Sequence, residues 1–87
     1  MEPRVPSKFW ENLKKLLKEY AGPAAELIME DTLQEVGKNS CEEVIIPEIP
    51  LVLEKLIEIS SEYLSPKNSE KLKTDIKVLF NQTFTSL

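Results

Sequence analysis

Apolar residues recur three and four positions apart along most of this 87-residue chain. Such spacing places them on one face of an α-helix, so each stretch predicts a helix with one buried side. The pattern as a whole predicts an all-α fold, a compact bundle of four main helices with a short helical turn. The helices are expected at about 7–20, 23–36, 48–64 and 69–83, and the turn near 41–46.

The second predicted helix has the clearest start and stop. Gly22-Pro23 ends the first helix and opens the second, because proline at a first helical position loses no needed hydrogen bond. Gly37 is expected to end it in a left-handed conformation. Its buried stripe is predicted to be Ala25, Ile28, Met29, Thr32, Leu33 and Val36.

The other three helices show apolar faces of the same kind. Ser7 is expected to cap the first helix, and Pro66 to end the third. The predicted face of the first helix is Phe9, Trp10, Leu13, Leu16, Leu17 and Tyr20. That of the third is Val52, Leu53, Leu56, Ile57, Ser60, Tyr63 and Leu64. That of the fourth is Leu72, Ile76, Leu79, Phe80, Thr83, Phe84 and Leu87.

The segment between the second and third helices leaves more than one conformation open. Ser40 and Glu43 have the spacing of a capping box, which would open the short turn. Val44–Pro50 could be helical, turned or extended, although a strand there has no evident partner. Pro50 fits the first turn of the third helix.

Size and composition indicate one domain, at 7–87, preceded by an extended arm at 1–6 that holds two prolines. Cys41 is the single cysteine, so no internal disulfide can form, which suits a reducing compartment. The chain shows no signal-peptide core and no apolar run of about 20 residues that would span a bilayer. We therefore expect a soluble cytoplasmic protein without a membrane partner.

Charge is segregated along the chain, whose net charge is −4. Residues 21–36 carry four acids and no base, whereas 65–87 carry four bases and two acids. Several like charges lie four residues apart, each costing an isolated helix roughly 0.2–0.5 kcal/mol. That cost falls if the basic first and last helices flank the acidic second and third. The acids then either face basic neighbours or dock onto a basic partner.

The candidate partner surface combines acids of the second and third helices with apolar residues of the fourth. Its acidic members are Glu26, Glu30, Glu54, Glu58 and Glu62. Its apolar members are Phe80, Phe84 and Leu87, which also form the candidate surface for a homodimer.

Residues that would carry catalysis are scarce. The chain has no histidine, the commonest general base and metal ligand at neutral pH. Cys41 at a turn N-terminus could form a thiolate, but Glu42 and Glu43 would oppose it and no histidine could act as its base. We therefore expect no catalytic residues, no metal, no cofactor and no enzymatic activity. Trp10 is interpreted as a core residue.

The run from Leu16 to Val44 resembles a small helical domain found at the C-terminal ends of bacterial Ser/Thr kinases and related signalling proteins. The similarity rests on an apolar helix leading into Gly22-Pro23, on Leu27-Ile28 and Leu33, and on Gly37 with a Ser40-x-x-Glu43-Val44 restart. The resemblance covers about a third of the chain. It implies a bacterial, signalling-associated interaction or regulatory module.

The first functional hypothesis is a non-enzymatic protein–protein interaction or regulatory module that binds a protein partner. The alternative is a small nucleic-acid-binding protein that uses the basic faces of the first and last helices. The residues of that alternative would be Lys14, Lys15, Lys18, Lys67, Lys71, Lys73 and Lys77. The net negative charge argues against it, because Lys and Arg supply the affinity for phosphates.

Overall fold

The computed structural model describes residues 4–85, and regular structure in that range is helical apart from one isolated β-bridge. The α-helices are α1 (Ser7–Ala21), α2 (Ala25–Glu35), α3 (Ile49–Ser60) and α4 (Pro66–Phe84). Single 3-10 turns are η1 (Gly22–Ala24), η2 (Cys41–Glu43) and η3 (Ile46–Glu48). The predicted all-α class is confirmed. The radius of gyration, 12.2 Å, is about that expected for a compact domain of this length.

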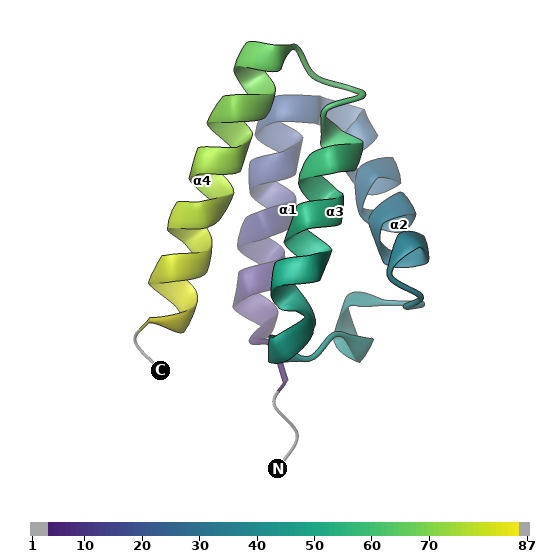
Figure 1. Cartoon of the computed structure of the whole chain (residues 1–87), viewed down its shortest axis with the longest axis vertical. Coiled ribbons are helices and arrows are strands. Elements are labelled where there is room, and N and C mark those ends of the chain that lie inside the picture. The colour runs from purple at the N-terminus through teal and green to yellow at the C-terminus, as the bar shows by residue number, and fades with distance from the viewer. Residues whose placement is uncertain (1–3, 86–87) are drawn as a thin grey trace.

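The helices run alternately up and down, and both ends of the described chain lie at the same end of the molecule (Figure 1). α1 packs most closely on α4, and α2 on α3. Contacts between α1 and α2, and between α3 and α4, are less extensive. Each close pair joins helices of like charge. α1 and α4 carry four lysines each, whereas the charged residues of α2 are all acids and those of α3 are mainly acids.

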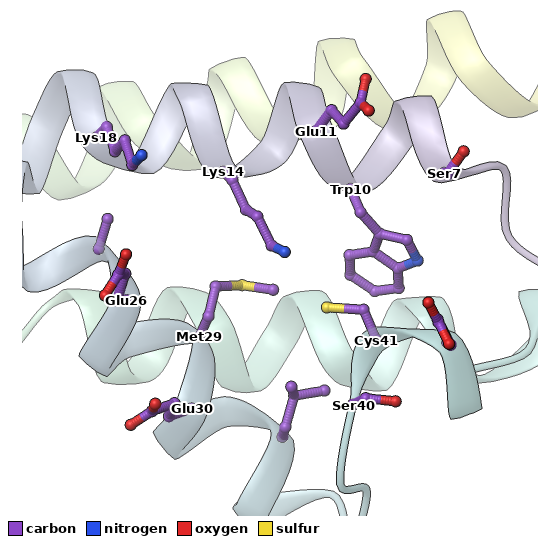
Figure 2. Close-up of a pocket in the computed structure, with 13 residues that line it drawn as sticks. Ser7, Trp10, Glu11, Lys14, Lys18, Glu26, Met29, Glu30, Ser40 and Cys41 are labelled. Carbon is purple, nitrogen blue, oxygen red and sulfur yellow. The ribbon is translucent and has the colours of Figure 1, made fainter.

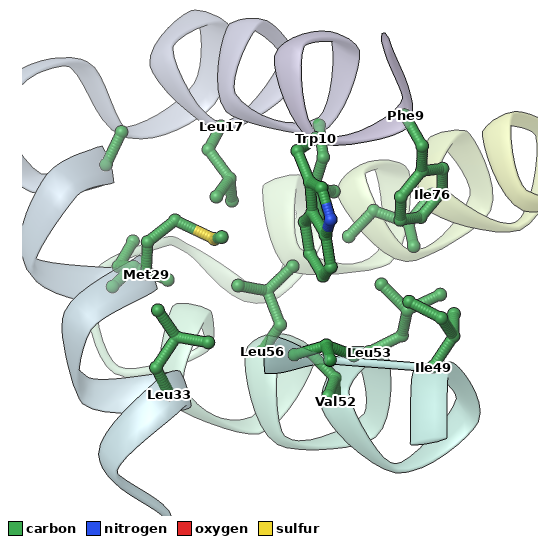
Figure 3. Close-up of a cluster of buried hydrophobic side chains, with 14 of the residues drawn as sticks. Phe9, Trp10, Leu17, Met29, Leu33, Ile49, Val52, Leu53, Leu56 and Ile76 are labelled. Atoms are coloured by element: carbon green, nitrogen blue, oxygen red, sulfur yellow. The ribbon is translucent and has the colours of Figure 1, made fainter. Parts of the chain in front are cut away.

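One apolar core holds the four helices together (Figure 3). The predicted stripe of α2 is buried from Ala25 to Leu33, and Val36 is half-buried. Phe9, Trp10, Leu13 and Leu17 of α1 also lie inside. The face predicted for the third helix fails only beyond the end of α3, where Tyr63 lies in a turn and remains 45% exposed.

Gly22 makes the corner between α1 and α2. Its φ of 57° and ψ of −129° lie in a region that essentially only glycine occupies, and its amide donates to the Lys18 carbonyl. Gly22 is also the first residue of the 3-10 turn η1, which continues through Pro23, so the regular helix begins at Ala25 rather than at 23. Gly37 has φ 74°, which confirms the predicted left-handed stop.

The segment after α2 contains two short turns instead of one. The Glu43 carboxylate accepts from the amides of Asn39 (2.8 Å) and Ser40 (3.1 Å), which is the carboxylate half of the predicted capping box. Helix does not continue to 46, because Val44 is extended. A second turn, η3, forms where Glu48 accepts from the Ile45 amide at 3.0 Å and pairs with Lys38 at 2.9 Å.

Helix boundaries around the two serine–proline sites differ from the predictions. Ser7 is the first residue of α1, and Pro6 occupies the capping position. α3 ends at Ser60, and the chain continues to Leu64 as a turn. α4 begins at Pro66 instead of 69, because the Ser65 hydroxyl accepts from the Asn68 amide and Pro66 takes a first-turn position.

The predicted arm at 1–6 is described only from Arg4, which forms an antiparallel bridge with Ile45. Residues 1–3 and 86–87, including Leu87, lie outside the described range. Within residues 4–85 no helix has the length and apolar character needed to cross a membrane.

Candidate functional site

A groove of about 540 Å³ separates α1 from α2 and is bounded at one end by η2 (Figure 2). α1 contributes Ser7, Trp10, Glu11, Lys14 and Lys18 to its lining. α2 contributes Ala25, Glu26, Met29, Glu30 and Leu33, and the turn contributes Ser40, Cys41 and Glu42.

The groove exists because the corner at Gly22 is part of a 3-10 turn, Gly22–Ala24, that precedes α2. Those three residues displace the start of α2, so α1 and α2 contact each other less than either contacts its main partner. The hydrogen bonds that Glu43 accepts fix the loop before η2, and that turn places Cys41 and Glu42 against the open end.

The floor of the groove is apolar. It is made of Trp10, Ala25, Met29 and Leu33, which belong to the core and are at most 9% exposed. Trp10 is thus a core residue, as predicted from the sequence, whose remaining exposed edge faces the groove. A ligand would contact this floor without any core residue having to leave its place.

Opposite charges line the two walls. Lys14 and Lys18 lie four residues apart on α1, and Glu26 and Glu30 lie four apart on α2, so each pair shares one helix face. All four side chains are exposed. In the range 4–85 no ion pair within 4 Å joins one wall to the other. The walls therefore offer a positive and a negative row to a bound molecule.

Cys41 lies at the η2 end, near Lys14 (Figure 2). Burial raises the pKa of its thiol, and the positive charge of Lys14 offsets part of that rise. A raised pKa keeps the thiol protonated at neutral pH, which is the opposite of what a nucleophilic cysteine needs.

The structure distributes the predicted partner surface over separate places. Glu26 and Glu30 line the groove. Glu58 and Glu62 border a second hollow of about 180 Å³ with Glu35, Lys55 and Ile59. Glu54 is exposed on α3 and lines neither of these hollows.

The apolar members of that surface lie at the C-terminal end of α4. The Phe84 ring stacks against Phe9 and Phe80, with ring centroids 5.2 and 4.9 Å apart. Both Phe80 and Phe84 are half-buried, so much of the apolar area expected to be free for a partner is used inside the fold. Leu87 is beyond the described residues.

Sequence reasoning did not identify the groove as a site. A signal was present: a lysine pair beside Trp10 on one helix, and a glutamate pair beside Met29 on the next, with a tight corner between them. Because successive helices joined by a short corner pack as neighbours, the two rows can border a common cleft. The width of that cleft depends on the corner geometry, which periodicity does not give.

No group of three or more cysteine and carboxylate side chains within residues 4–85 is arranged to hold a metal ion. Among known families, a model described as a domain of unknown function (DUF8082) matches residues 8–49. The match extends from the second residue of α1 to the first of α3, and so contains almost the whole lining of the groove. No curated protein and no solved structure matches the chain.

Proposed function

We propose that this protein is a non-enzymatic interaction module that binds a segment of a partner protein in the groove between α1 and α2. The observation that carries the proposal is the combination of an apolar floor with two unpaired, oppositely charged walls. Contact with the exposed edges of the floor and with the aliphatic parts of the lysine and glutamate side chains would supply affinity. The exposed charges would set the register and orientation of the partner.

A helical ligand suits this site better than an extended one. Docking of an extended peptide on a protein usually needs an unpaired strand edge, and the described residues hold only the bridge between Arg4 and Ile45. Two helical walls that carry opposite charges above an apolar floor instead suit one face of an amphipathic helix. In the setting implied by the resemblance, the module would belong to bacterial signalling and act by recruiting or regulating its partner.

The proposal can be tested without knowing the natural partner. A display library of amphipathic helical peptides is selected against the protein, and the best peptide is titrated into isotope-labelled protein. We expect the largest chemical-shift changes at the Trp10 indole N–H and the Met29 methyl group. Changes centred instead on α4, or on the acidic hollow at Glu58 and Glu62, would place binding elsewhere and refute the proposal.

Nucleic-acid binding is the second proposal, favoured by the packing of the lysine-bearing helices α1 and α4 side by side (Figure 1). It has less support because Lys14 and Lys18 line the groove opposite acids. Asp75 of α4 and Glu11 and Glu19 of α1 also interrupt the positive surface. Fluorescence anisotropy with a labelled duplex at low salt tests it: this proposal predicts salt-sensitive binding, and no change in anisotropy would remove it.

A further inference from the structure

Beyond binding a partner segment, we infer which chemistry that segment has: an amphipathic helix of about three turns with acids along one edge and bases along the other. This inference rests on the proposed function. The length follows from the α1 wall, where lining residues extend from Ser7 to Lys18. At a rise of 1.5 Å per residue that wall is about 16 Å long, which corresponds to three turns of a bound helix.

The charges on the two edges of the partner helix follow from the charges on the two walls of the groove. A helix whose apolar stripe lies on Trp10 and Met29 turns one flank toward Lys14 and Lys18. Its other flank then faces Glu26 and Glu30 (Figure 2). Acidic residues on the first flank and basic residues on the second would neutralise both walls, whereas a helix with two flanks of one sign would always be repelled by one of them.

A second copy of this groove is a poor occupant. Turning one copy about an axis parallel to the helices would bring the lysine wall of each onto the glutamate wall of the other, so the charges alone would permit a dimer. The shapes of the two grooves do not permit this dimer, because two hollows placed face to face leave their apolar floors out of contact. A convex helix fills the groove and meets the charges as well.

The two walls also fix the direction of the bound helix. Reversing a helix in the groove exchanges its flanks, so a helix with one acidic and one basic edge matches both walls in only one direction. Glu11 also lies on α1, but its carboxylate points away from Met29 and Cys41 in Figure 2, so the α1 side of the groove keeps its positive charge. Glu42 belongs to η2, across the groove from α1. Direction is therefore set by Lys14, Lys18, Glu26 and Glu30.

Cys41 provides a reporter of direction, because it is the single cysteine and lies at one end of the groove. Two versions of one designed peptide, with an apolar stripe and edges of opposite charge, carry an activated disulfide at the N-terminus or at the C-terminus. Because burial raises the pKa of the Cys41 thiol, the reaction is run in alkaline buffer. There the thiolate attacks the disulfide, forms a mixed disulfide with the peptide and releases the activating thiol. The wild-type protein should trap one version at least about tenfold more than the other, because four charges of the groove favour one direction together.

The decisive variant exchanges the walls: Lys14→Glu, Lys18→Glu, Glu26→Lys and Glu30→Lys. All four positions are exposed, and the net charge does not change. We expect this variant to trap the opposite terminus. The matched control exchanges four exposed charges outside the groove, Lys8→Glu, Lys15→Glu, Asp31→Lys and Glu35→Lys, and should keep the wild-type preference.

The result separates the two proposals. Each comparison is the ratio of the amounts of the two peptides that one protein traps through Cys41. A change in the reactivity of the thiol affects both amounts equally and does not change their ratio. Equal trapping of both termini, or the same preferred terminus in the wall-exchanged variant, would overturn the inference and leave the groove as a binding site. If the peptide bound nowhere in the groove, with no response of Trp10 fluorescence and no trapping, the proposed function itself would fail.

Discussion

Phe84, near the C-terminal end of α4, packs its ring against Phe9 in the first turn of α1, with the ring centroids 5.2 Å apart. This contact joins the two ends of the described chain and closes the α1–α4 pair. A residue that sequence reasoning assigned to a partner surface therefore contributes to the fold.

Replacing Phe84 should consequently cost stability. Phe→Ala at a fully buried site costs 3–5 kcal/mol, so we expect Phe84→Ala, at a half-buried site, to lower the free energy of unfolding by about 2 kcal/mol. Val78→Ala, on the same helix but 48% exposed, should change it by less than about 0.5 kcal/mol. Urea unfolding measures both values, and equal losses would contradict the packing role of Phe84.

Ser60 is buried at 1% exposure, and its hydroxyl has no hydrogen-bond partner among the described residues. A buried polar group without a partner retains its desolvation cost, so Ser60→Ala should stabilise the protein by about 1 kcal/mol. The control is Ser61→Ala, where the hydroxyl is exposed and donates to the Glu58 carbonyl at 2.6 Å, and where we expect little change. A loss of stability in Ser60→Ala would show that the hydroxyl does find a partner.

The corner at Gly22 should not tolerate a side chain. A Cβ there would meet no heavy atom within 4 Å, so any penalty comes from the backbone conformation alone. Gly22→Ala is expected to cost about 2 kcal/mol, the order of strain for a residue forced into this region. Thermal unfolding provides the measurement, and an unchanged melting temperature would mean that the corner relaxes to another geometry.

Stability should also depend on the protonation of Glu48. The hydrogen bond from the Ile45 amide, followed by the Lys38 ammonium, lowers the pKa of this carboxyl below its ordinary 4.5. The folded state thus binds fewer protons than the unfolded state in that range. The contribution is complete above the ordinary pKa and is lost as pH falls through the folded value.

We therefore expect Glu48→Gln to flatten the acid side of the melting-temperature profile as pH falls below the ordinary carboxyl pKa of 4.5. Glu54→Gln, at an exposed position of α3, should keep the wild-type profile. Parallel profiles for wild type and Glu48→Gln would show that the segment between Lys38 and Glu48 does not depend on this carboxylate.

The elements that the sequence predicts best are those specified by local pattern. The stripe of α2 and the stop at Gly37 are confirmed, because three- and four-residue spacing and a required left-handed glycine are local properties. Ser65-Pro66 is a cap followed by a first-turn proline, which is the local signal for the start of α4. The same proline also fits the end of the preceding helix, so the local pattern does not decide between the two roles.

The local sequence pattern does not predict how the helices pack against one another. The pairing of α1 with α4, and the gap that leaves a groove beside Trp10, depend on the direction of the chain after Gly22 and on where η2 folds back. Charge alone suggested basic helices on either side of acidic ones. Apolar contacts decide the arrangement, because exposed charges contribute little to stability.

The central claim is that the groove between α1 and α2 binds the partner segment, and the most direct measurement is a comparison of dissociation constants by calorimetry. Two double variants of α1 carry the same change in charge: Lys14→Glu with Lys18→Glu in the groove wall, and Lys8→Glu with Lys15→Glu outside it. For a peptide selected against the wild-type protein, we predict that the first variant weakens binding by about tenfold and the second by less than about twofold. Equal effects of the two variants would show that only the overall charge matters, and would contradict a binding site in the groove.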